Sequence, residues 1–416
     1  MITNRMQKRY VLCLAAIVLA LTFIGCHDQQ QTQNSQHKLL LISFDGFRYD
    51  YLNKVDTPHF DSLAAGGVQA EGLIPVFPSK TFPNHYAIAT GLYPENSGFV
   101  GNTMYDPKWK EWYRIRDRKA VEDGKWYGGE PIWNTLEKQG IRTGTMFWVG
   151  SEANIQGMHP TNWKKYDGDM PFKARVDTVV KWLSAPDTQA VDFATLYFEH
   201  VDGIGHRYGT ESDSLKAAIR ESDRIMGYLK EQLWNKNLWD NTNILIVSDH
   251  GMVDLAADKT IFLDQIIDIA DTERIIWGPL TMIQPKEGTE EQVYQALKKK
   301  EKHYRVYRKE EIPERYHLKN HGRVTDLVVV ADLGYMVLNS KYKEQFVQSL
   351  PRATHGYDPA EKKMEALFLA HGPAFKSDTT VKAFQNIHLY ELMNHVMGTK
   401  SAPNDGSLDS VRVLLR

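Results

Sequence analysis

The stretch KLLLISFDG, residues 38–46, is a nearly continuous apolar run that ends in Asp45 and Gly46. Apolar runs of this kind form strands that are buried on both faces of a parallel sheet. The polar pair that follows marks the carboxyl end of such a strand. We therefore expect the folded part of the chain to begin at Lys38 with a central β-strand.

Similar apolar runs recur along the chain, and helical patterns lie between them. The runs are RTGTMFWVG (142–150), DFATLYFEH (192–200), NILIVSDHG (243–251), DLVVVADLG (326–334) and EALFLAHGP (365–373). This alternation predicts an α/β fold, with a mainly parallel central sheet sandwiched by helices. Ligands of such sheets bind beyond the carboxyl ends of the strands. Polar side chains at these expected ends are Asp45, Glu199, His200, Asp249, His250 and His371.

One region departs from this alternation. Residues 274–338 read as strand, helix, strand, strand, which predicts a small α+β insertion at the edge of the main sheet. Its helix, TEEQVYQALKKK (289–300), begins with acidic and ends with basic residues, as the helix dipole favours. The lysine run therefore reads as a helix end and not as a nucleic-acid patch. We expect residues 38–416 to form one catalytic domain that carries this insertion.

The N-terminal segment has the pattern of an export signal. Three basic residues precede the apolar run VLCLAAIVLALTFIGC (11–26), which is short for a membrane-spanning helix. FIGC resembles a bacterial lipobox, which predicts a lipoprotein signal over residues 1–25 and a lipid-bound Cys26; plain secretion and an uncleaved anchor are the alternatives. The Gln-rich residues 26–37 read as a flexible tether. We expect an exported protein in the periplasm or at the cell surface.

Composition and cysteine count argue against a nucleic-acid partner and against an internal disulfide. The 416 residues carry a formal net charge of -2, so no overall attraction to nucleic acid is expected, and we predict no stable nucleic-acid partner. Of the two cysteines, Cys13 lies within the predicted signal. The mature chain therefore has no internal disulfide, and its stability must come from core packing.

Several separated segments place aspartate or histidine beside glycine or beside another metal-binding side chain. Each is weak alone, because an aspartate at a strand end is usually a turn residue or a helix cap. Together they form a set of metal ligands, and imidazoles mixed with carboxylates suit zinc better than magnesium or calcium. The candidate ligands are Asp45, Thr81, Asp202, His206, Asp249, His250 and His355.

The loop that carries Thr81 lies within VFPSKTFPNHYAIATGLYP, residues 76–94. Pro78 and Pro83 restrict the backbone on both sides of the threonine. A helix that starts near Asn84 would point its first N–H groups at the loop, which is a favourable place for a phosphate. The less specific interpretation is a stiff strand-to-helix turn without chemistry.

These motifs resemble the nucleotide pyrophosphatases/phosphodiesterases of the alkaline phosphatase superfamily, and the lipobox suggests a bacterial member. The resemblance covers residues 38–372. It is carried by DGFR, PSKTFPNHY, GLYP, GNTMYDP, YFEHVDGIGH, SDHGM and HGY in that order. It implies an alkaline phosphatase-like fold and two zinc ions per subunit.

The resemblance also implies roles for individual residues. Thr81 matches the nucleophile that forms a covalent intermediate, Asn102 matches the donor to a phosphate oxygen, and Phe82 and Tyr197 match the rings that bracket a nucleobase. The implied ligands of one zinc are Asp45, Thr81, Asp249 and His250, and those of the other are Asp202, His206 and His355. A threonine hydroxyl is too weak an acid to attack phosphorus unaided, and coordination to zinc lowers its pKa by several units.

The leading functional hypothesis is therefore hydrolysis of nucleotide phosphodiester or pyrophosphate bonds, with release of a nucleoside monophosphate. Hydrolysis of a choline- or glycerol-type phospholipid and hydrolysis of phosphomonoesters are alternatives on the same core, since aromatic rings also cage a quaternary ammonium. A lipoprotein that binds without catalysis and a magnesium- or manganese-dependent sugar-phosphate mutase are more remote alternatives.

Overall fold

The computed structural model describes residues 37–186, 188–256, 258–342 and 351–416. The predicted signal, residues 1–25, and nearly all of the predicted tether lie outside these ranges. Residues 37–416 form one compact unit. Within the described ranges, no helix combines the length and the apolar character needed to span a bilayer.

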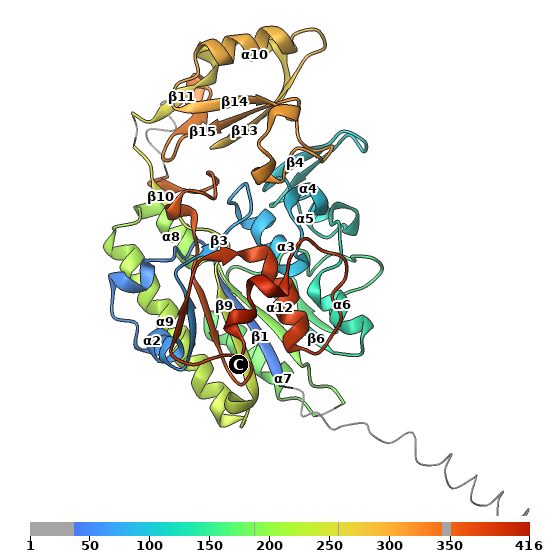
Figure 1. The fold of residues 1–416 in the computed structure, drawn as a ribbon, viewed down its shortest axis with the longest axis vertical. Coiled ribbons are helices and arrows are strands. Elements are labelled where there is room, and N and C mark those ends of the chain that lie inside the picture. Colours follow the sequence, from blue (N-terminus) through green and yellow to red (C-terminus); the bar gives the residue numbers. More distant parts are fainter. Residues whose placement is uncertain (1–36, 187, 257, 343–350) are drawn as a thin grey trace, which may run out of the picture. The chain divides into compact units, whose positions relative to one another are not determined.

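The centre of the molecule is an eight-stranded mixed sheet (Figure 1). Its strand order is β19 (Thr379–Val381), β2 (Gly67–Ala70), β18 (Phe368–His371), β9 (Thr242–Val247), β1 (Lys38–Phe44), β8 (Phe193–Phe198), β6 (Thr143–Met146) and β7 (Asn162–Lys164). Strand β1 pairs in parallel with both β8 and β9. Only β18 runs against its neighbours, β9 and β2. The predicted fold class is thus confirmed, and β1 lies at its centre.

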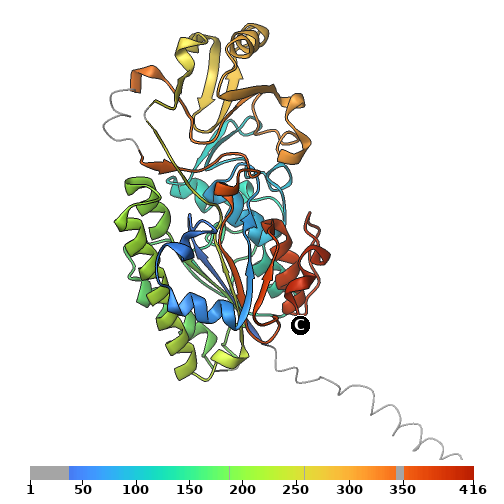
Figure 2. The ribbon, with the colours of Figure 1, turned by 60° about the vertical axis from the view of Figure 1, so that its left-hand side comes forward.

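Alternating side chains of β1 point to two separate cores, because successive residues of a strand face opposite sides of the sheet. Leu39 and Leu41 belong to one core, and Leu40, Ile42 and Phe44 belong to the other. The first core is closed by α3 (Thr81–Thr90), α6 (Ile132–Lys138) and α12 (Leu389–Val396), and the second by α2 (Pro58–Ala65), α7 (Phe172–Leu183), α8 (His200–Tyr208) and α9 (Asp213–Asn235). Figure 2 shows the green helices of the second group and the red α12 on opposite sides of the sheet.

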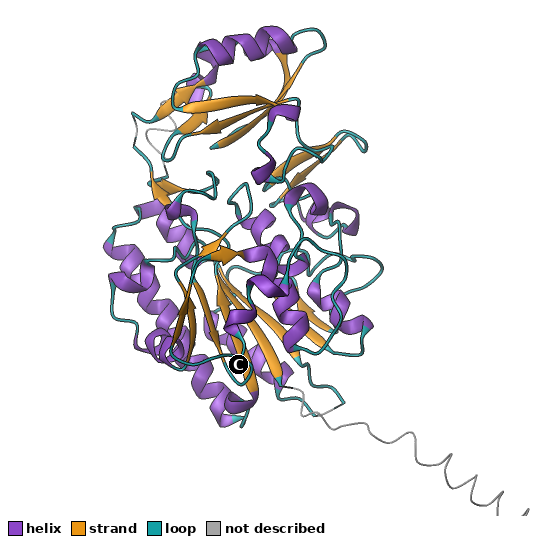
Figure 3. Ribbon diagram, viewed as in Figure 1, coloured by secondary structure: helices purple, strands orange, loops and turns teal. Residues whose placement is uncertain are grey.

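A second, antiparallel sheet contains β12 (Thr272–Ile276), β13 (Leu280–Pro285), β15 (Leu327–Ala331) and β14 (Tyr304–Arg308) in that order. Helix α10 (Glu290–Lys299) covers one face of it (Figure 3). Its Val293 and Leu297 belong to the same core cluster as the side chains of this sheet. The sequence pattern contained one strand fewer before the helix than the structure has. The run DLVVVADLG forms β15, which pairs with β13 and β14 and so lies in this smaller sheet and not in the central one.

Short elements complete the fold. The two-stranded ladders pair β3 (Leu73–Ile74) with β20 (Phe384–Gln385), β4 (Thr103–Asp106) with β5 (Glu111–Arg114), β10 (Val253–Asp254) with β17 (Ala353–Thr354), and β11 (Thr260–Phe262) with β16 (Met336–Leu338). The one-turn helices are α4 (Pro94–Ser97) and α5 (Arg118–Val121).

The segment between β14 and β15 contacts the loop that precedes the nucleophile candidate. Arg323 is 5% exposed and donates to Asp106 Oδ2, 2.9 Å away, and to the carbonyl oxygens of Gly98 and Trp126. The rings of Phe77 and Tyr316 stack 4.1 Å apart. Tyr316 thus contacts the residue four positions before Thr81, whereas Arg323 binds residues that follow helix α3.

Candidate active site

Three adjacent parallel strands deliver most of the predicted ligands to one edge of the sheet. Asp45 follows β1, and Asp249 and His250 follow β9. Helix α8, which follows β8, carries Asp202 and His206 one turn apart. Because β8, β1 and β9 are neighbours and run in the same direction, their carboxyl ends converge.

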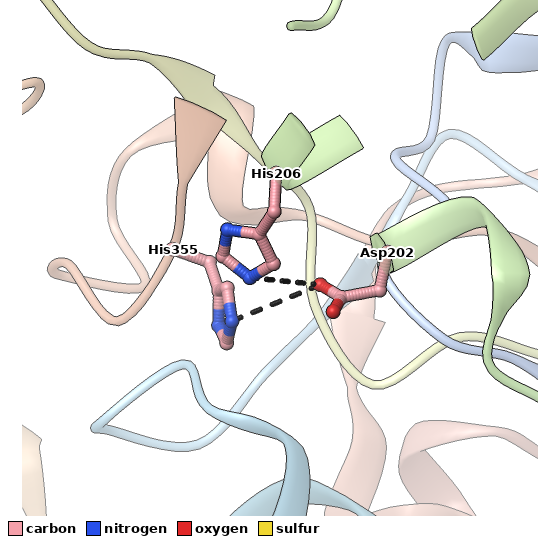
Figure 4. A group of neighbouring side chains, drawn as sticks. All are labelled: Asp202, His206 and His355. Atoms are coloured by element: carbon pink, nitrogen blue, oxygen red, sulfur yellow. Dashed lines mark ion pairs between the residues drawn. The ribbon is translucent and has the colours of Figure 1, made fainter. Parts of the chain in front are cut away.

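Asp202, His206 and His355 form one group of possible metal ligands (Figure 4). Asp202 Oδ1 lies 3.4 Å from His206 Nε2 and 3.8 Å from His355 Nε2. His355 follows the short strand β17. Its ring also stacks on that of His250, with the ring centres 3.5 Å apart. This stacking joins the first group directly to the second.

The second group contains Asp45, Thr81, Asp249 and His250. His250 Nε2 lies 3.0 Å from Asp249 Oδ2, 3.6 Å from Asp45 Oδ1 and 3.4 Å from the Thr81 hydroxyl oxygen. Asp45, Asp202 and His250 also offer ligand atoms within 4.8 Å of one another. The structure thus brings all seven predicted ligands into one cluster.

The hydrogen bonds of the three histidines fix which ring nitrogen faces the cluster. Nδ1 of His206, His250 and His355 lies 2.7–2.9 Å from the carbonyl oxygens of Ala353, Gly251 and Ser79, respectively. A carbonyl oxygen only accepts, so each Nδ1 carries the hydrogen and donates it. In the neutral ring, each Nε2 then presents its lone pair to the carboxylates, as a metal ligand requires.

Unsatisfied carboxylate oxygens provide an independent test of whether a cation fits. Asp45 Oδ1, Asp202 Oδ1 and Asp249 Oδ2 are buried and have no hydrogen-bond partner among the described residues. These same atoms face the histidine Nε2 atoms. Buried carboxylates without partners are costly unless a cation coordinates them. The donor set therefore fits metal ions of the first transition row.

The electrostatics of the cluster agree with this fit. Burial, and then the neighbouring Asp249, raise the pKa of Asp45 well above its ordinary value. Burial alone would raise the pKa of Asp249, but His250 and His85 lower it below its ordinary value. Burial, together with His250 and His206, lowers the pKa of His355. The carboxylates of Asp45 and Asp249 thus lie close together in a buried site, and a bound cation would neutralise their negative charge.

Thr81 occupies the first position of helix α3. The helix begins at Thr81, three residues earlier than predicted, because Pro83 is tolerated in a first turn whose N–H groups need no partner inside the helix. Asn84 instead braces the loop, since its side chain accepts from Val76 N–H and donates to the carbonyl of Lys80. Asn102 Oδ1 accepts the N–H of Phe82, 3.0 Å away, which leaves the amide NH2 group to donate beside Thr81.

His85 is a site residue that the sequence interpretation did not include. It lies one turn after Thr81 on the same helix, and its ring is fully buried. Nδ1 lies 3.0 Å from the Thr81 carbonyl oxygen and 3.4 Å from Asp249 Oδ2, and Nε2 lies 2.8 Å from Ser43 Oγ. Both ring nitrogens are thus engaged, so His85 positions Thr81 and Asp249 and is a poorer ligand than His250.

The substitution His85→Ala is expected to weaken metal retention roughly 10- to 100-fold, as the loss of an outer-shell partner commonly does. Titration of the purified protein with a chelator measures this. His200→Ala is the matched control, because His200 is a mostly buried imidazole that contacts Ser222 and the Ala218 carbonyl away from the cluster. Equal metal retention in both variants would contradict the role given to His85.

A cavity of about 310 Å³ opens beside the cluster. Its lining includes Asp45, Thr81, Phe82, Ile115, Arg116, Arg118, Val121, Phe147, Trp148, Val149, Gly150, Glu152, Tyr166, Tyr197 and Asp202. Phe82 and Tyr197, the predicted pair of rings, both lie in this lining. The Tyr197 hydroxyl donates to Asp45 Oδ2 at 2.6 Å, so Tyr197 also orients one of the candidate metal ligands. Tyr166, which sequence interpretation did not include, is 42% exposed in the same cavity.

Three polar residues at expected strand ends lie outside the cluster. His371 was expected at the same edge, but β18 is antiparallel, so His371 pairs with Ile244 near the start of β9 and packs against Trp239. Glu199 forms an ion pair with the buried Arg175, 2.6 Å away. His200 contacts Ser222. Strand direction accounts for the first difference, and local pairing accounts for the other two.

Fold and site together define an α/β protein with a buried cluster of carboxylates, imidazoles and one hydroxyl beside an aromatic-lined cavity. A family model described as type I phosphodiesterase / nucleotide pyrophosphatase matches residues 39–358. The chain belongs to this family.

Individual relatives agree with the family match. The human ectonucleotide pyrophosphatase/phosphodiesterase family member 5 is 37% identical over 97% of this chain and 81% of its own length. The bis(5'-adenosyl)-triphosphatase enpp4 of Xenopus laevis is 35% identical over 97% of this chain and 86% of its own. The solved structure of the murine ectonucleotide pyrophosphatase/phosphodiesterase 5 matches with a TM-score of 0.87 and 37% identity, covering 91% of this chain and all of that one. An inactive threonine-to-alanine variant of that murine protein has been solved in complex with AMP.

Proposed function

We propose that this chain is a two-zinc phosphodiesterase/nucleotide pyrophosphatase. It hydrolyses nucleotide phosphodiester or pyrophosphate bonds through a covalent threonine intermediate and releases a nucleoside monophosphate. The observation that carries the proposal is the position of the Thr81 hydroxyl, 3.4 Å from His250 Nε2 at the junction of the metal-binding cluster and the aromatic cavity. Its family membership and the AMP complex of the murine relative support the same substrate class.

Asp45, Thr81, Asp249 and His250 would hold one zinc ion, and Asp202, His206 and His355 would hold the other. Mixed imidazole and carboxylate donors suit zinc. When bound, such ions supply Lewis acidity that lowers the pKa of hydroxyl groups and offsets charge on phosphate oxygens. The assignment is supported by two features of this chain: the histidine rings oriented by their Nδ1 hydrogen bonds to carbonyl oxygens, and the unsatisfied carboxylate oxygens.

The chain's own residues would carry the bond changes. The Thr81 hydroxyl releases its proton to solvent, and its oxygen forms a bond to phosphorus as the bond from phosphorus to the leaving oxygen breaks and that product departs. Water then attacks phosphorus and releases a proton as the bond to Thr81 breaks. The Thr81 oxygen regains a proton from solvent, and a nucleoside monophosphate leaves. The NH2 group of Asn102 would donate to a non-bridging phosphate oxygen, an interaction that strengthens as negative charge develops there.

The cavity would hold the nucleoside. A nucleobase that stacks on Phe82 needs a second ring opposite, and the sequence resemblance points to Tyr197. Because the Tyr197 hydroxyl is held by Asp45, the exposed ring of Tyr166 is a second candidate for this contact. Tyr166 and Tyr197 lie with ring centres 6.2 Å apart, so a bound base can reach both.

Two substitutions separate these roles. Tyr166→Ala is expected to raise KM for a nucleotide substrate roughly tenfold, since stacking contributes about 1–3 kcal/mol per base. Tyr197→Phe keeps the ring but removes the hydrogen bond to Asp45, so we expect it to lower kcat more than it raises KM. Steady-state kinetics on one nucleotide diester measures both effects. An unchanged KM in Tyr166→Ala would leave Tyr197 as the stacking ring.

A substrate panel with metal analysis tests the proposal. The purified chain is expected to contain zinc and to hydrolyse a nucleotide diester faster than a choline phosphodiester or a simple phosphomonoester. The phospholipid alternative predicts that the choline ester is hydrolysed fastest, and the monoesterase alternative predicts that the monoester is hydrolysed fastest. A chain without activity toward any of them would instead support a binding protein.

The cellular location is part of the proposal. The basic and apolar residues 1–26 support export, with lipid attachment at Cys26 to a bacterial membrane and a short tether up to residue 37. The relatives named above are vertebrate proteins, so the bacterial origin rests on the lipobox-like FIGC alone. Mass spectrometry of the mature N-terminus would distinguish a lipid-modified Cys26 from a plain cleaved end.

A further inference from the structure

Lys80, directly before the nucleophile candidate, has a side chain without an evident structural partner. Its backbone is fixed, because its carbonyl accepts from the Asn84 backbone N–H and side-chain NH2, and its N–H donates to the Pro78 carbonyl. The side chain is half-buried. Across the described ranges, its ammonium group has neither a hydrogen bond to an acceptor nor an ion pair, although a shielded ammonium ordinarily has acceptors.

Two glycines shape the path of this side chain. Gly278, between β12 and β13, has φ +148°, and a Cβ atom there would lie 3.2 Å from Lys80 Nζ. Gly356, which follows His355, has φ +105°, and its Cβ would lie 2.9 Å from Lys80 Cε. The lysine therefore extends between two loops that leave room for it, with its ammonium end at the Gly278 loop.

The position of Lys80 relative to the cluster indicates which part of a substrate it faces. The nucleoside cavity is lined by Thr81 and Phe82, but Lys80, His206 and His355 are not in its lining. The Thr81 hydroxyl belongs to the group of Asp45, Asp249 and His250. In an in-line displacement the leaving oxygen departs on the side opposite the nucleophile. His206 and His355 belong to the other group of metal ligands and lie outside the lining of the nucleoside cavity. The stem of Lys80 passes beside Gly356, the residue that follows His355.

We infer that the Lys80 ammonium group forms a subsite for a phosphate of the leaving group. The preferred substrates are then nucleotides with a pyrophosphate linkage, in which a further phosphate follows the bond that breaks, over simple nucleotide diesters. This inference rests on the proposed function and names the substrate class within it. The competing interpretation is that the lysine stem only fills space between the two loops.

The substitution Lys80→Met separates these interpretations, because methionine keeps most of the apolar stem and removes the charge. Two substrates with a similar nucleoside monophosphate part are compared: a nucleoside triphosphate, whose leaving group carries phosphate, and a p-nitrophenyl nucleotide ester, whose leaving group carries none. The ratio of kcat/KM for the triphosphate to that for the ester is expected to fall roughly 10- to 100-fold, as for a lost charged hydrogen bond. Lys236→Met, at the exposed end of α9, is the control and keeps the wild-type ratio.

Binding gives a second readout that does not depend on turnover. In the Thr81→Ala background with metal bound, titration calorimetry with inorganic pyrophosphate is expected to show a Kd that rises at least about tenfold when Lys80→Met is added. The Kd for AMP is expected to change much less. If Lys80→Met lowers kcat/KM equally for both substrates and weakens binding equally for both ligands, Lys80 has a purely structural role. If it changes neither kcat/KM nor Kd, the subsite is also overturned.

The outcome for the wild-type enzyme separates this inference from the proposed function. If the wild-type chain hydrolyses neither substrate, the proposed function fails and the subsite fails with it. If it hydrolyses both and Lys80→Met leaves the ratio unchanged, only the leaving-group subsite fails.

Discussion

Thr81→Ala is expected to lower kcat for a nucleotide diester by at least about 10,000-fold, as the removal of a catalytic nucleophile does in other hydrolases. The physical reason is that Thr81 carries the only aliphatic hydroxyl among the described residues that line the cavity, and the phenol hydroxyl of Tyr197 already donates to Asp45 Oδ2. The helix itself should persist, because alanine favours helical structure. Initial rates, together with metal content and AMP affinity, measure the effect.

Two controls sharpen this experiment. Thr90→Ala removes a buried hydroxyl at the other end of the same helix, where it donates to the Tyr86 carbonyl, and should keep most of the activity. Thr81→Ser retains a hydroxyl and should retain part of kcat. Rapid acid quenching of the wild-type reaction should trap the nucleoside monophosphate as a phosphodiester on the peptide that contains residue 81. Near-full activity of Thr81→Ala would refute the nucleophile assignment, whatever the fold.

Removal of metal is expected to produce the second large effect. Exhaustive chelation should abolish hydrolysis, and addition of zinc should restore it while magnesium should not, because the donor set mixes imidazoles with carboxylates. Loss of metal should also lower Tm, since a ligand that binds only the folded state stabilises it. Activity assays and thermal unfolding before and after chelation measure both outcomes.

A pair of substitutions tests the same point at one residue. Asp249→Asn removes a charge from the cluster and should reduce both metal content and activity by a large factor. Asp223→Asn is the matched control: Asp223 is also buried, but it accepts the N–H groups of His59 and Phe60 at the start of α2. We expect it to reduce thermal stability without releasing metal. Full activity of the chelated enzyme would be incompatible with the proposed mechanism.

Much of the fold was predictable because its central strands have strong local signals. The apolar runs that become β1, β8 and β9 end in polar residues, and parallel neighbours bring those ends together without further information. The convergence of Asp45, Asp202 and Asp249 therefore follows from strand type and order. The number of residues between these aspartates in the sequence does not predict that they converge.

Strand direction was not predictable from the same signals. The run EALFLAHGP is as apolar as the others, yet β18 is antiparallel and carries His371 to the far end of the sheet. An apolar run specifies burial on both faces and leaves orientation to the connections around it. Those connections depend on tertiary contacts that no local pattern contains.

The two site residues that were missed differ in how they could have been found. His85 had a signal, because a residue four positions after Thr81 lies on the same face of a helix. Tyr166 had none, since it follows no regular pattern. It is placed by tertiary contacts: buried Arg175 donates to the carbonyl oxygens of Gly168 and Met170, which fixes the loop after it.

The donor set is assembled from distant parts of the chain. Ser79, whose carbonyl orients the His355 ring, precedes it by 276 positions, and the whole smaller sheet is synthesised between them. A nascent chain on the ribosome therefore has Thr81 long before it has His355. Under the proposed mechanism, full metal loading must follow translation of residue 355. A prematurely terminated product is then expected to be inert toward the nucleotides of the cell that makes it.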